Sequence, residues 1–289
     1  MVSTMWLATR AAMVAILAVV SSQNLAKAED SPLARGTYLM NSIVACDACH
    51  TPKGPDGLPV AGQELAGGFV IDARAFHAVT PNITPDPETG IGKWTDEQII
   101  DAIRNGKRPD GTTIGPPMPV QFYRSMSDTD VSAIVAYLRS VKPITHTVVK
   151  SVFKIPLPDS YGPTVTHVAD VPRQNRTEYG HYLADIGHCM ECHTPRVKGR
   201  LDMSRIGAGG AELPVFPAGM VVSANLTPAN SEGIAGWTDA QVEETITTGV
   251  RPDGRRLVRL MAFDWYKNID KGDLDALVAY LRTLKPAKP

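Results

Sequence analysis

Apolar residues recur at helical spacing in short stretches of this chain. Ile99, Ile100 and Ile103 predict a helix that begins with the capping box Thr95-Asp96-Glu97-Gln98 and ends at Gly106. Apolar residues from Val131 to Leu138 share one face of a second predicted helix, which begins at Ser127 and ends at Lys142-Pro143. These stretches predict a mainly helical protein.

Two further stretches complete the predicted elements. An earlier helix is expected from about Pro32 to Val44. Glycine and proline then punctuate the sequence from Lys53 to Lys93, which we interpret as a long loop.

The second part of the chain repeats the first at an offset of 143 residues. The matches are Asn82-Ile83-Thr84-Pro85 with Asn225-Leu226-Thr227-Pro228, Trp94-Thr95-Asp96 with Trp237-Thr238-Asp239, Arg108-Pro109-Asp110-Gly111 with Arg251-Pro252-Asp253-Gly254, and Ala136-Tyr137-Leu138-Arg139 with Ala279-Tyr280-Leu281-Arg282. Near the start of each copy the register slips by one, so that Gly36 and Tyr38 match Gly180 and Tyr182. The repeat predicts two copies of one all-α unit, residues 33–143 and 177–286, joined by a proline-rich linker, residues 144–176.

The N-terminal stretch has the pattern of an export signal. Arg10 precedes ten apolar residues, Ala11 to Val20, and Ala26-Lys27-Ala28 provides a small-residue cleavage site. We therefore expect residues 1–28 to be a signal peptide and the protein to be periplasmic; the alternative is a retained N-terminal anchor. No later stretch approaches 18 apolar residues, so membrane contact is expected only indirectly, through a partner.

Composition is compatible with two packed units in the 289-residue chain. Hydrophobic residues make up 43% and aromatic residues only 6%, so a bound apolar group would offset the low aromatic content. Removing residues 1–28 takes Lys and Arg from 29 to 27 against 30 Asp and Glu, a net charge of about −3. Nothing in this balance indicates binding to nucleic acid.

The four cysteines lie in two C-x-x-C-H motifs, Cys46-Asp47-Ala48-Cys49-His50 and Cys189-Met190-Glu191-Cys192-His193. This spacing is typical of covalent attachment of haem c. Two thiols bind the vinyl groups and the adjacent imidazole is the proximal iron ligand. A zinc half-site, a thioredoxin-like pair and chance are the alternatives. The motifs predict two covalently bound haems, attached through Cys46, Cys49, Cys189 and Cys192, with iron ligands His50 and His193.

The distal ligand is predicted from the same offset. Met118 and Met261 match each other, although little of the sequence around them is shared. A packed core methionine is the alternative for each. Methionine opposite histidine fills all six positions of the iron, so we expect single-electron transfer and no catalytic residues.

Other repeated polar residues leave two interpretations open. Asn82 and Asn225 either hydrogen-bond haem propionates or cap loops. The same choice between propionate contact and an ordinary structural role holds for a tryptophan pair and an arginine pair, Trp94 with Trp237 and Arg108 with Arg251. The histidines that do not repeat are expected in loops or on the surface.

The chain resembles dihaem class I cytochromes c, especially the cytochrome c subunits of bacterial periplasmic dehydrogenases. The resemblance rests on both haem motifs, on residues 82–98, on Met118-Pro119 and on residues 136–140. It implies two tandem class I cytochrome c domains, with proximal and distal ligands at His50, Met118, His193 and Met261. Many such subunits carry three haem units and a C-terminal anchor, whereas this chain has two motifs.

Electron transfer is the leading functional hypothesis. The expected partners are a periplasmic dehydrogenase as donor and a small cytochrome or terminal oxidase as respiratory acceptor. The alternative is a dihaem enzyme of the peroxidase or thiosulfate-oxidising type, which requires an open haem site. The matched methionines disfavour that alternative.

Overall fold

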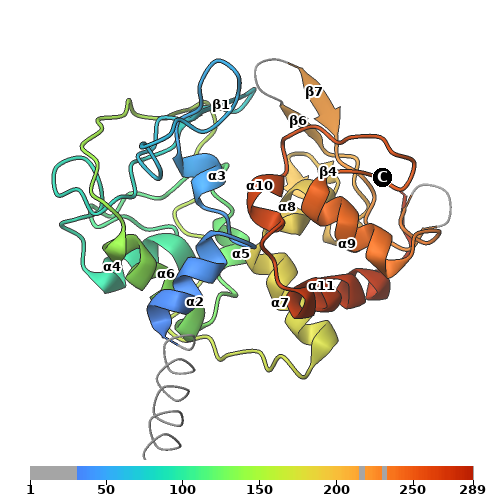
Figure 1. Cartoon of the computed structure of the whole chain (residues 1–289). Helices are drawn as coiled ribbons and strands as arrows, with labels where there is room; N and C mark the ends of the chain where they lie inside the picture. The colour runs from blue at the N-terminus through green and yellow to red at the C-terminus, as the bar shows by residue number, and fades with distance from the viewer. Residues whose placement is uncertain (1–30, 215–218, 230–232, 289) are drawn as a thin grey trace, which may run out of the picture.

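The computed structural model describes residues 31–214, 219–229 and 233–288. The expected signal peptide lies outside these residues. Two lobes lie side by side, each built on three longer helices (Figure 1). These are α2 (Pro32–Met40), α4 (Asp96–Arg104) and α6 (Asp128–Ser140) in the first lobe, and α7 (Arg176–Ile186), α9 (Asp239–Thr248) and α11 (Lys271–Thr283) in the second.

Short elements fill the spaces between the long helices. The helical ones are α3 (Asp47–His50), α5 (Val120–Tyr123), α8 (Cys189–His193), η1 (Met203–Arg205) and α10 (Phe263–Tyr266). The strands are β1 (Val70–Ala73), β2 (Phe76–Val79), β3 (Val152–Phe153), β4 (Arg196–Val197), β5 (Arg200–Leu201), β6 (Glu212–Pro214) and β7 (Met220–Val222). None of the helices in the described ranges is long and apolar enough to cross a bilayer.

The prediction of an all-α fold with two tandem domains is wrong. Helices hold about 34% of the described residues, and antiparallel strands form three small sheets. The hairpin β1–β2 lies in the stretch that the sequence predicts as a loop. The sequence does not reveal the hairpin, because its two-residue turn, Arg74-Ala75, lacks the Asn-Gly or Asp-Gly signature. One continuous hydrophobic cluster runs through both lobes, so separate cores are not shown. The boundaries 33–143, 144–176 and 177–286 stay a prediction.

A glycine permits the close helix crossing in each lobe. α2 packs on α6, and α7 packs on α11. A Cβ atom on Gly36 would lie 1.9 Å from the carbonyl oxygen of Ala133, and one on Gly180 would lie 1.8 Å from that of Ala276. Both glycines are therefore required by the approach of one backbone to the other, which explains why they repeat.

The predicted ends of α4 and their repeats in α9 are confirmed, whereas α2 ends at Met40 and not near Val44. Thr95 and Thr238 cap α4 and α9, each in a complete capping box with the glutamine three residues later. Gly106 follows α4 with φ +65°, and Gly249 ends α9 with φ +69°. Helix start and stop signals were thus readable from sequence in both copies.

The residues after α6 wrap over the first lobe. Asn82 Nδ2 donates to the Ile144 carbonyl at 2.7 Å, β3 pairs with β2, and Tyr161 Oη donates to the Ile114 carbonyl at 2.8 Å. The Thr145 hydroxyl donates to Asp86 at 2.7 Å. The predicted linker thus contacts its own lobe along much of its length.

Asp86 gives this attachment a pH dependence. Hydrogen bonds from Thr145 and Thr89 lower the pKa of Asp86 from its ordinary value of 3.8 to about 2. Because the carboxylate is bound better in the folded protein, its stabilisation is complete above about pH 4 and is lost as pH falls toward 2.

We therefore expect Asp86→Asn to lower Tm at neutral pH and to flatten the fall of Tm between pH 4 and pH 2. Thermal unfolding followed by circular dichroism measures both effects. The control is Asp159→Asn, which changes an exposed carboxylate in the same wrapping segment. If Asp86→Asn and the parent lose Tm in parallel on acidification, Asp86 does not carry the effect.

Two tyrosine–aspartate pairs join the lobes reciprocally. Tyr38 of the first lobe donates to Asp273 Oδ2 of the second at 2.8 Å, and Tyr182 of the second donates to Asp130 Oδ2 of the first at 2.5 Å. Burial raises the pKa of both phenols. Since Tyr38 matches Tyr182 and Asp130 matches Asp273, the contact is the same in both directions. We call these two pairs the inter-lobe clasps.

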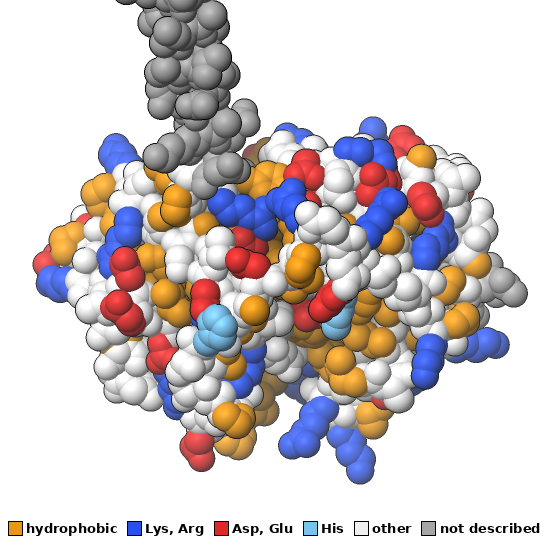
Figure 2. Space-filling view, turned by 90° about the horizontal axis from the view of Figure 1, so that it is seen from below, with side chains coloured by type: hydrophobic (Ala, Val, Ile, Leu, Met, Phe, Trp, Pro, Cys, Tyr) orange, Lys and Arg blue, Asp and Glu red, His pale blue; other side chains and the backbone are white. Residues whose placement is uncertain are grey.

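One clasp carries an ion pair in addition. Arg35 donates to Asp130 through Nε at 2.7 Å and through Nη2 at 2.9 Å. On the other side, the Arg173 guanidinium lies 3.7 Å from Asp273 and its side chain is 54% exposed. Figure 2 shows acidic and basic side chains close together near the junction of the lobes. The two clasps are therefore matched in hydrogen bonding but unequal in charge.

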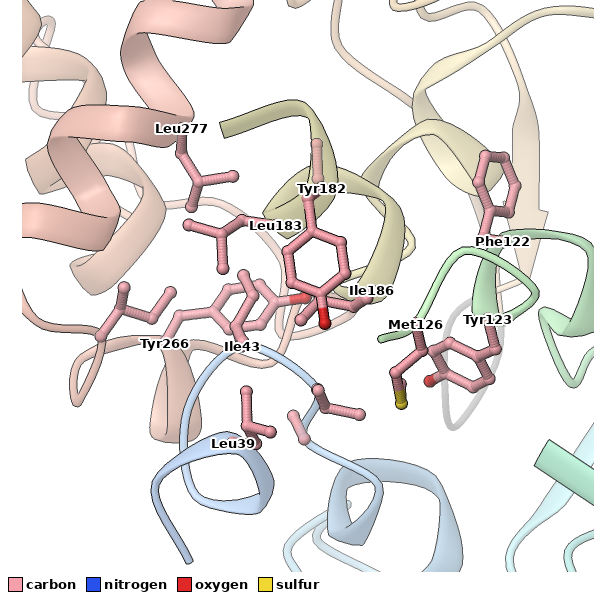
Figure 3. Close-up of a cluster of buried hydrophobic side chains, with 14 of the residues drawn as sticks. Leu39, Ile43, Phe122, Tyr123, Met126, Tyr182, Leu183, Ile186, Tyr266 and Leu277 are labelled. Carbon is pink, nitrogen blue, oxygen red and sulfur yellow. The ribbon is translucent and has the colours of Figure 1, made fainter. Parts of the chain in front are cut away.

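Apolar side chains from both lobes pack beside the clasps. Figure 3 shows Ile43 next to Tyr266, with Leu183 and Leu277 above them and Leu39 below. All five belong to the continuous hydrophobic cluster. The first C-x-x-C-H motif begins at Cys46, shortly after Ile43. Packing of Ile43 in the inter-lobe core therefore helps to fix the position of the motif.

Candidate functional site

Each C-x-x-C-H motif forms a single helical turn at the end of a tightly packed segment. Cys46 caps α3, and α8 begins at Cys189 itself. Ala45 and His188, which precede the first cysteines, adopt left-handed conformations with φ +46° and +45°. The chain thus turns sharply into both motifs, and the same backbone geometry occurs twice.

The two motif histidines make the same hydrogen bond. His50 Nδ1 lies 2.9 Å from the Pro81 carbonyl, and His193 Nδ1 lies 2.8 Å from the Ala224 carbonyl. A carbonyl oxygen only accepts, so Nδ1 is the protonated nitrogen and Nε2 keeps a free lone pair. Burial lowers the pKa of both imidazoles, against the opposing effect of these bonds. Each ring is therefore held neutral, as an iron ligand requires.

The residue after each histidine fixes the loop that follows. Thr51 and Thr194 are fully buried, and their hydroxyls accept from Leu65 N at 2.9 Å and Gly207 N at 3.3 Å. The His50 carbonyl accepts from Gly67 N, and that of His193 accepts from Gly209 N. Both imidazoles are thus held by ring and main chain together.

All four cysteines lie in the described part of the chain, and none of them forms a disulfide. Burial is the largest cause that raises the pKa of Cys46 and Cys189 to about 12 and that of Cys192 to about 11. None of the four is fully buried, and Cys49 is exposed. The sulfur atoms are therefore reachable from outside while surrounded largely by protein.

Both predicted distal methionines stand directly before a short helix. Val120 N donates to the Met118 carbonyl and Phe263 N to the Met261 carbonyl, each at 2.9 Å. Both side chains are partly buried and pack against the hydrophobic cluster. Assignment of Met118 and Met261 as iron ligands stays a prediction, whereas Met40, Met126 and Met190, which do not repeat as methionine, are buried core residues.

The surroundings fit a haem in each lobe. Half-buried apolar side chains pack against the hydrophobic cluster at matching positions of the two lobes. They are Ile83 with Leu226, Trp94 with Trp237 and Ile103 with Ile246. Arg251 lies 5.1 Å over the Trp237 ring, and its buried Nε has no hydrogen-bond partner among the described residues, with Asp253 at 3.5 Å. A buried donor beside an apolar surface suits a propionate. Thiols, neutral imidazoles, apolar lining and this donor together match the group that the motifs predict.

The asparagine pair has a structural role. Asn82 Oδ1 accepts from Thr84 N at 2.9 Å, and Asn225 Oδ1 accepts from Thr227 N at 2.8 Å. Their Nδ2 groups donate to the carbonyls of Ile144 and Ala287. The loop-capping interpretation is confirmed, because these amides are occupied within the protein.

Sequence reasoning missed the residues that lie between the two motifs. Tyr123 and Tyr266 match at the offset of 143, and burial raises the pKa of both well above 10. The Cys49 thiol contributes to the raised pKa of Tyr266 and of Cys192, although it belongs to the other lobe. The Tyr123 ring also meets His188 edge-on at 6.1 Å. The two motifs are therefore within electrostatic reach of each other, across a buried aromatic layer.

Comparison with known proteins agrees with this geometry. The family described as cytochrome c oxidase, cbb3-type, subunit III matches residues 31–138. The fructose dehydrogenase cytochrome subunit of Gluconobacter japonicus is 32% identical over 91% of this chain and 54% of the subunit. A diheme cytochrome c-type protein of Cereibacter sphaeroides is 31% identical over 82% of this chain and 81% of that protein.

A third relative is the cytochrome c subunit of the quinone-dependent alcohol dehydrogenase of Gluconobacter oxydans, 30% identical over 77% of this chain and 48% of the subunit. The chain thus spans about half the length of the two dehydrogenase subunits. The chain belongs to the c-type cytochromes, in the family that includes cytochrome c subunits of bacterial dehydrogenases.

Proposed function

We propose that this cytochrome is a periplasmic dihaem protein that transfers single electrons from a dehydrogenase to a respiratory acceptor. The observation that carries the proposal is the repeated imidazole geometry, His50 to Pro81 and His193 to Ala224. Two equally prepared proximal ligands support two haems. Relatives named as dehydrogenase cytochrome subunits support a dehydrogenase as the donor.

The chain's own residues would hold each cofactor in four ways. The cysteine pair would anchor it, the histidine would bind one face of the iron, Met118 or Met261 would bind the other, and Trp94 or Trp237 would cover an edge. Haem c held by histidine and methionine exchanges one electron at a fairly high potential. The half-buried apolar lining would face the apolar surface of the cofactor.

The position of the two motifs supports exchange between the sites. Cys49 and Cys192 belong to different lobes, and the Cys49 thiol contributes to the raised pKa of both Cys192 and Tyr266. The inter-lobe clasps hold this arrangement rigid, because both aspartates are almost fully buried. Electron exchange between the lobes would therefore use this junction.

Redox titration of the purified holoprotein tests the proposal. We expect two haems per chain and two one-electron steps, together with the weak red absorption typical of methionine-ligated ferric haem. A reduced protein that binds carbon monoxide at either iron without any substitution would contradict it, since that behaviour belongs to a dihaem enzyme with an open site.

The distal ligands give a separate prediction. Met118→Ala is expected to lower one midpoint potential by roughly 0.1 V or more, within the range of about 0.8 V that axial ligands control. The same variant should open one iron to carbon monoxide. Met261→Ala should affect the other step, and Met203→Ala, which changes an exposed methionine, should affect neither. An unchanged spectrum in Met118→Ala would show that another group is the ligand.

A further inference from the structure

The two lobes differ in how the surface beside the distal methionine is covered. In the first lobe, β3 pairs with the outer edge of β2, with Phe153 opposite Phe76. Phe153 and Leu157 also press on Gly115, where a Cβ atom would lie 2.6 Å and 2.8 Å from their side chains. The segment from Ser151 to Tyr161 therefore covers both a strand edge and the loop that leads to Met118.

In the second lobe, the described residues leave the matching surface uncovered. β7 corresponds to β2, and among the described residues it pairs only with β6. Val79 of β2 is 7% exposed, whereas Val222, its match in β7, is 67% exposed. Gly115 is buried, whereas its match, Val258, is 47% exposed, and Leu260 beside it is 42% exposed. We call Met220, Val222, Val258 and Leu260 the open face.

Within the described ranges, the backbone groups on the outer edge of β7 have no hydrogen-bond partner. Ser223 exchanges hydrogen bonds with Gly210 and Ala211, so the N–H and C=O of Val222 point away from β6. At the matching place in the first lobe, Val79 N donates to Ser151 Oγ at 3.0 Å, and Ser151 Oγ donates to the Val79 carbonyl at 3.2 Å. The first lobe thus shows which kind of chain occupies this edge, namely an extended one.

Charge distinguishes the open face from its counterpart. Arg255, Arg256 and Arg259 lie exposed in the loop beside it, at the positions that Thr112, Thr113 and Pro116 hold in the first lobe. Among the described residues, Arg259 forms an ion pair with Asp264 and the Asp253 carboxylate lies near Arg255, whereas Arg256 has no ion-pair partner. An occupant with acidic side chains would neutralise this cluster, whereas the wrapping segment of the first lobe carries Lys150 and Lys154.

We propose that the open face binds an extended segment of the partner redox protein, a segment that adds a strand to β7 and carries acidic residues toward the three arginines. The proposal rests on the proposed function, because it places the partner beside the loop of Met261. Apolar side chains of the segment would cover Val222 and Val258, as Phe153 and Leu157 cover the first lobe.

A peptide test is available because the first lobe supplies a template. The probe is a fluorescent peptide with the sequence of residues 148–161 and the changes Lys150→Glu and Lys154→Glu; the unchanged sequence is the comparison. Fluorescence anisotropy with the holoprotein at low salt should show at least tenfold tighter binding of the acidic peptide. A photo-crosslinker on the peptide should label residues 220–222 or 255–260.

Two variants challenge the site independently. Val222→Pro removes the outward N–H donor, and the double variant Arg256→Glu with Arg259→Glu reverses the charge. Each is expected to lower the affinity for the acidic peptide at least tenfold. The controls Val149→Pro and Lys93→Glu change an exposed valine and an exposed lysine of the first-lobe side and should leave binding unchanged. If Val222→Pro does not fold, the charge-reversed variant still tests whether the open face binds the acidic peptide.

Three results would overturn the proposal. These are equal affinity for both peptides, binding that survives both variants, and self-association of the holoprotein that Val222→Pro abolishes, since the occupant would then be a second copy. Haem content and redox steps are measured on the same samples. Absent peptide binding in a protein with two haems contradicts this inference alone, whereas missing haem contradicts the proposed function.

Discussion

Replacement of Cys46 and Cys49 by serine is expected to halve the haem content, from two haems per chain to one. Serine cannot form the thioether bonds, so His50 and Met118 would be left to hold a haem that is free to dissociate. The second lobe keeps its own cysteines and its own histidine bond to Ala224. Haem absorbance in alkaline pyridine, divided by protein concentration, gives the ratio directly.

The repeat supplies a matched control for this experiment. Cys189→Ser with Cys192→Ser should also leave one haem, and mass spectrometry should find it on the peptide that contains Cys46 and Cys49. The two half-loaded proteins should each keep a different one of the two redox steps. Two haems in either double variant would show that another residue attaches the group, and none would show that loading of one lobe depends on the other.

Asp130→Ala is expected to destabilise the holoprotein by about 3 kcal/mol, the lower end of the range for breaking a buried ion pair. The variant leaves Arg35 without its two carboxylate contacts and Tyr182 without its acceptor. The side chains of Asp130 and Arg35 are only 6% and 19% exposed, so water replaces these contacts poorly. Chemical denaturation followed by circular dichroism, on samples of equal haem content, measures the loss.

The second clasp provides the comparison. Asp273→Ala is expected to cost less, because Asp273 has no two-point contact with an arginine and burial raises its pKa. A carboxylate that is poorly solvated and weakly paired contributes little to stability. A loss at Asp273 that equals or exceeds the loss at Asp130 would show that the tyrosine bonds, and not the ion pair, dominate the junction.

Local signals in the sequence predicted the local features well. Thr95 and Gln98 could be recognised as a capping box because both partners lie within four residues, and Ser127 could be recognised as the start of α6 for the same reason. The offset of 143 paired His50 with His193, and the structure gives both rings the same bond. Repetition was the strongest guide, because it marks the positions that both copies keep, including packing positions such as Gly36 and Gly180.

Long-range contacts left no such signal. Tyr38 and Asp273 are 235 residues apart, and neither spacing nor composition indicates that they meet. The hairpin β1–β2 was missed because its turn residues are ordinary, and α5 and α10 were missed because four residues carry no helical period. The Tyr123–Tyr266 layer was visible only as a repeat, since its position between the motifs depends on how the lobes dock.

The inter-lobe clasps have the form of a two-fold contact. When residue i of one unit touches residue j of the other and j touches i in return, the contact is isologous, as in a homodimer with two-fold symmetry. Such a dimer must present identical faces, so any change appears twice. Within one polypeptide the two copies need not be identical, and Arg35 stands where the other copy has Tyr179. A single chain can therefore keep a two-fold contact while its two halves carry different charges.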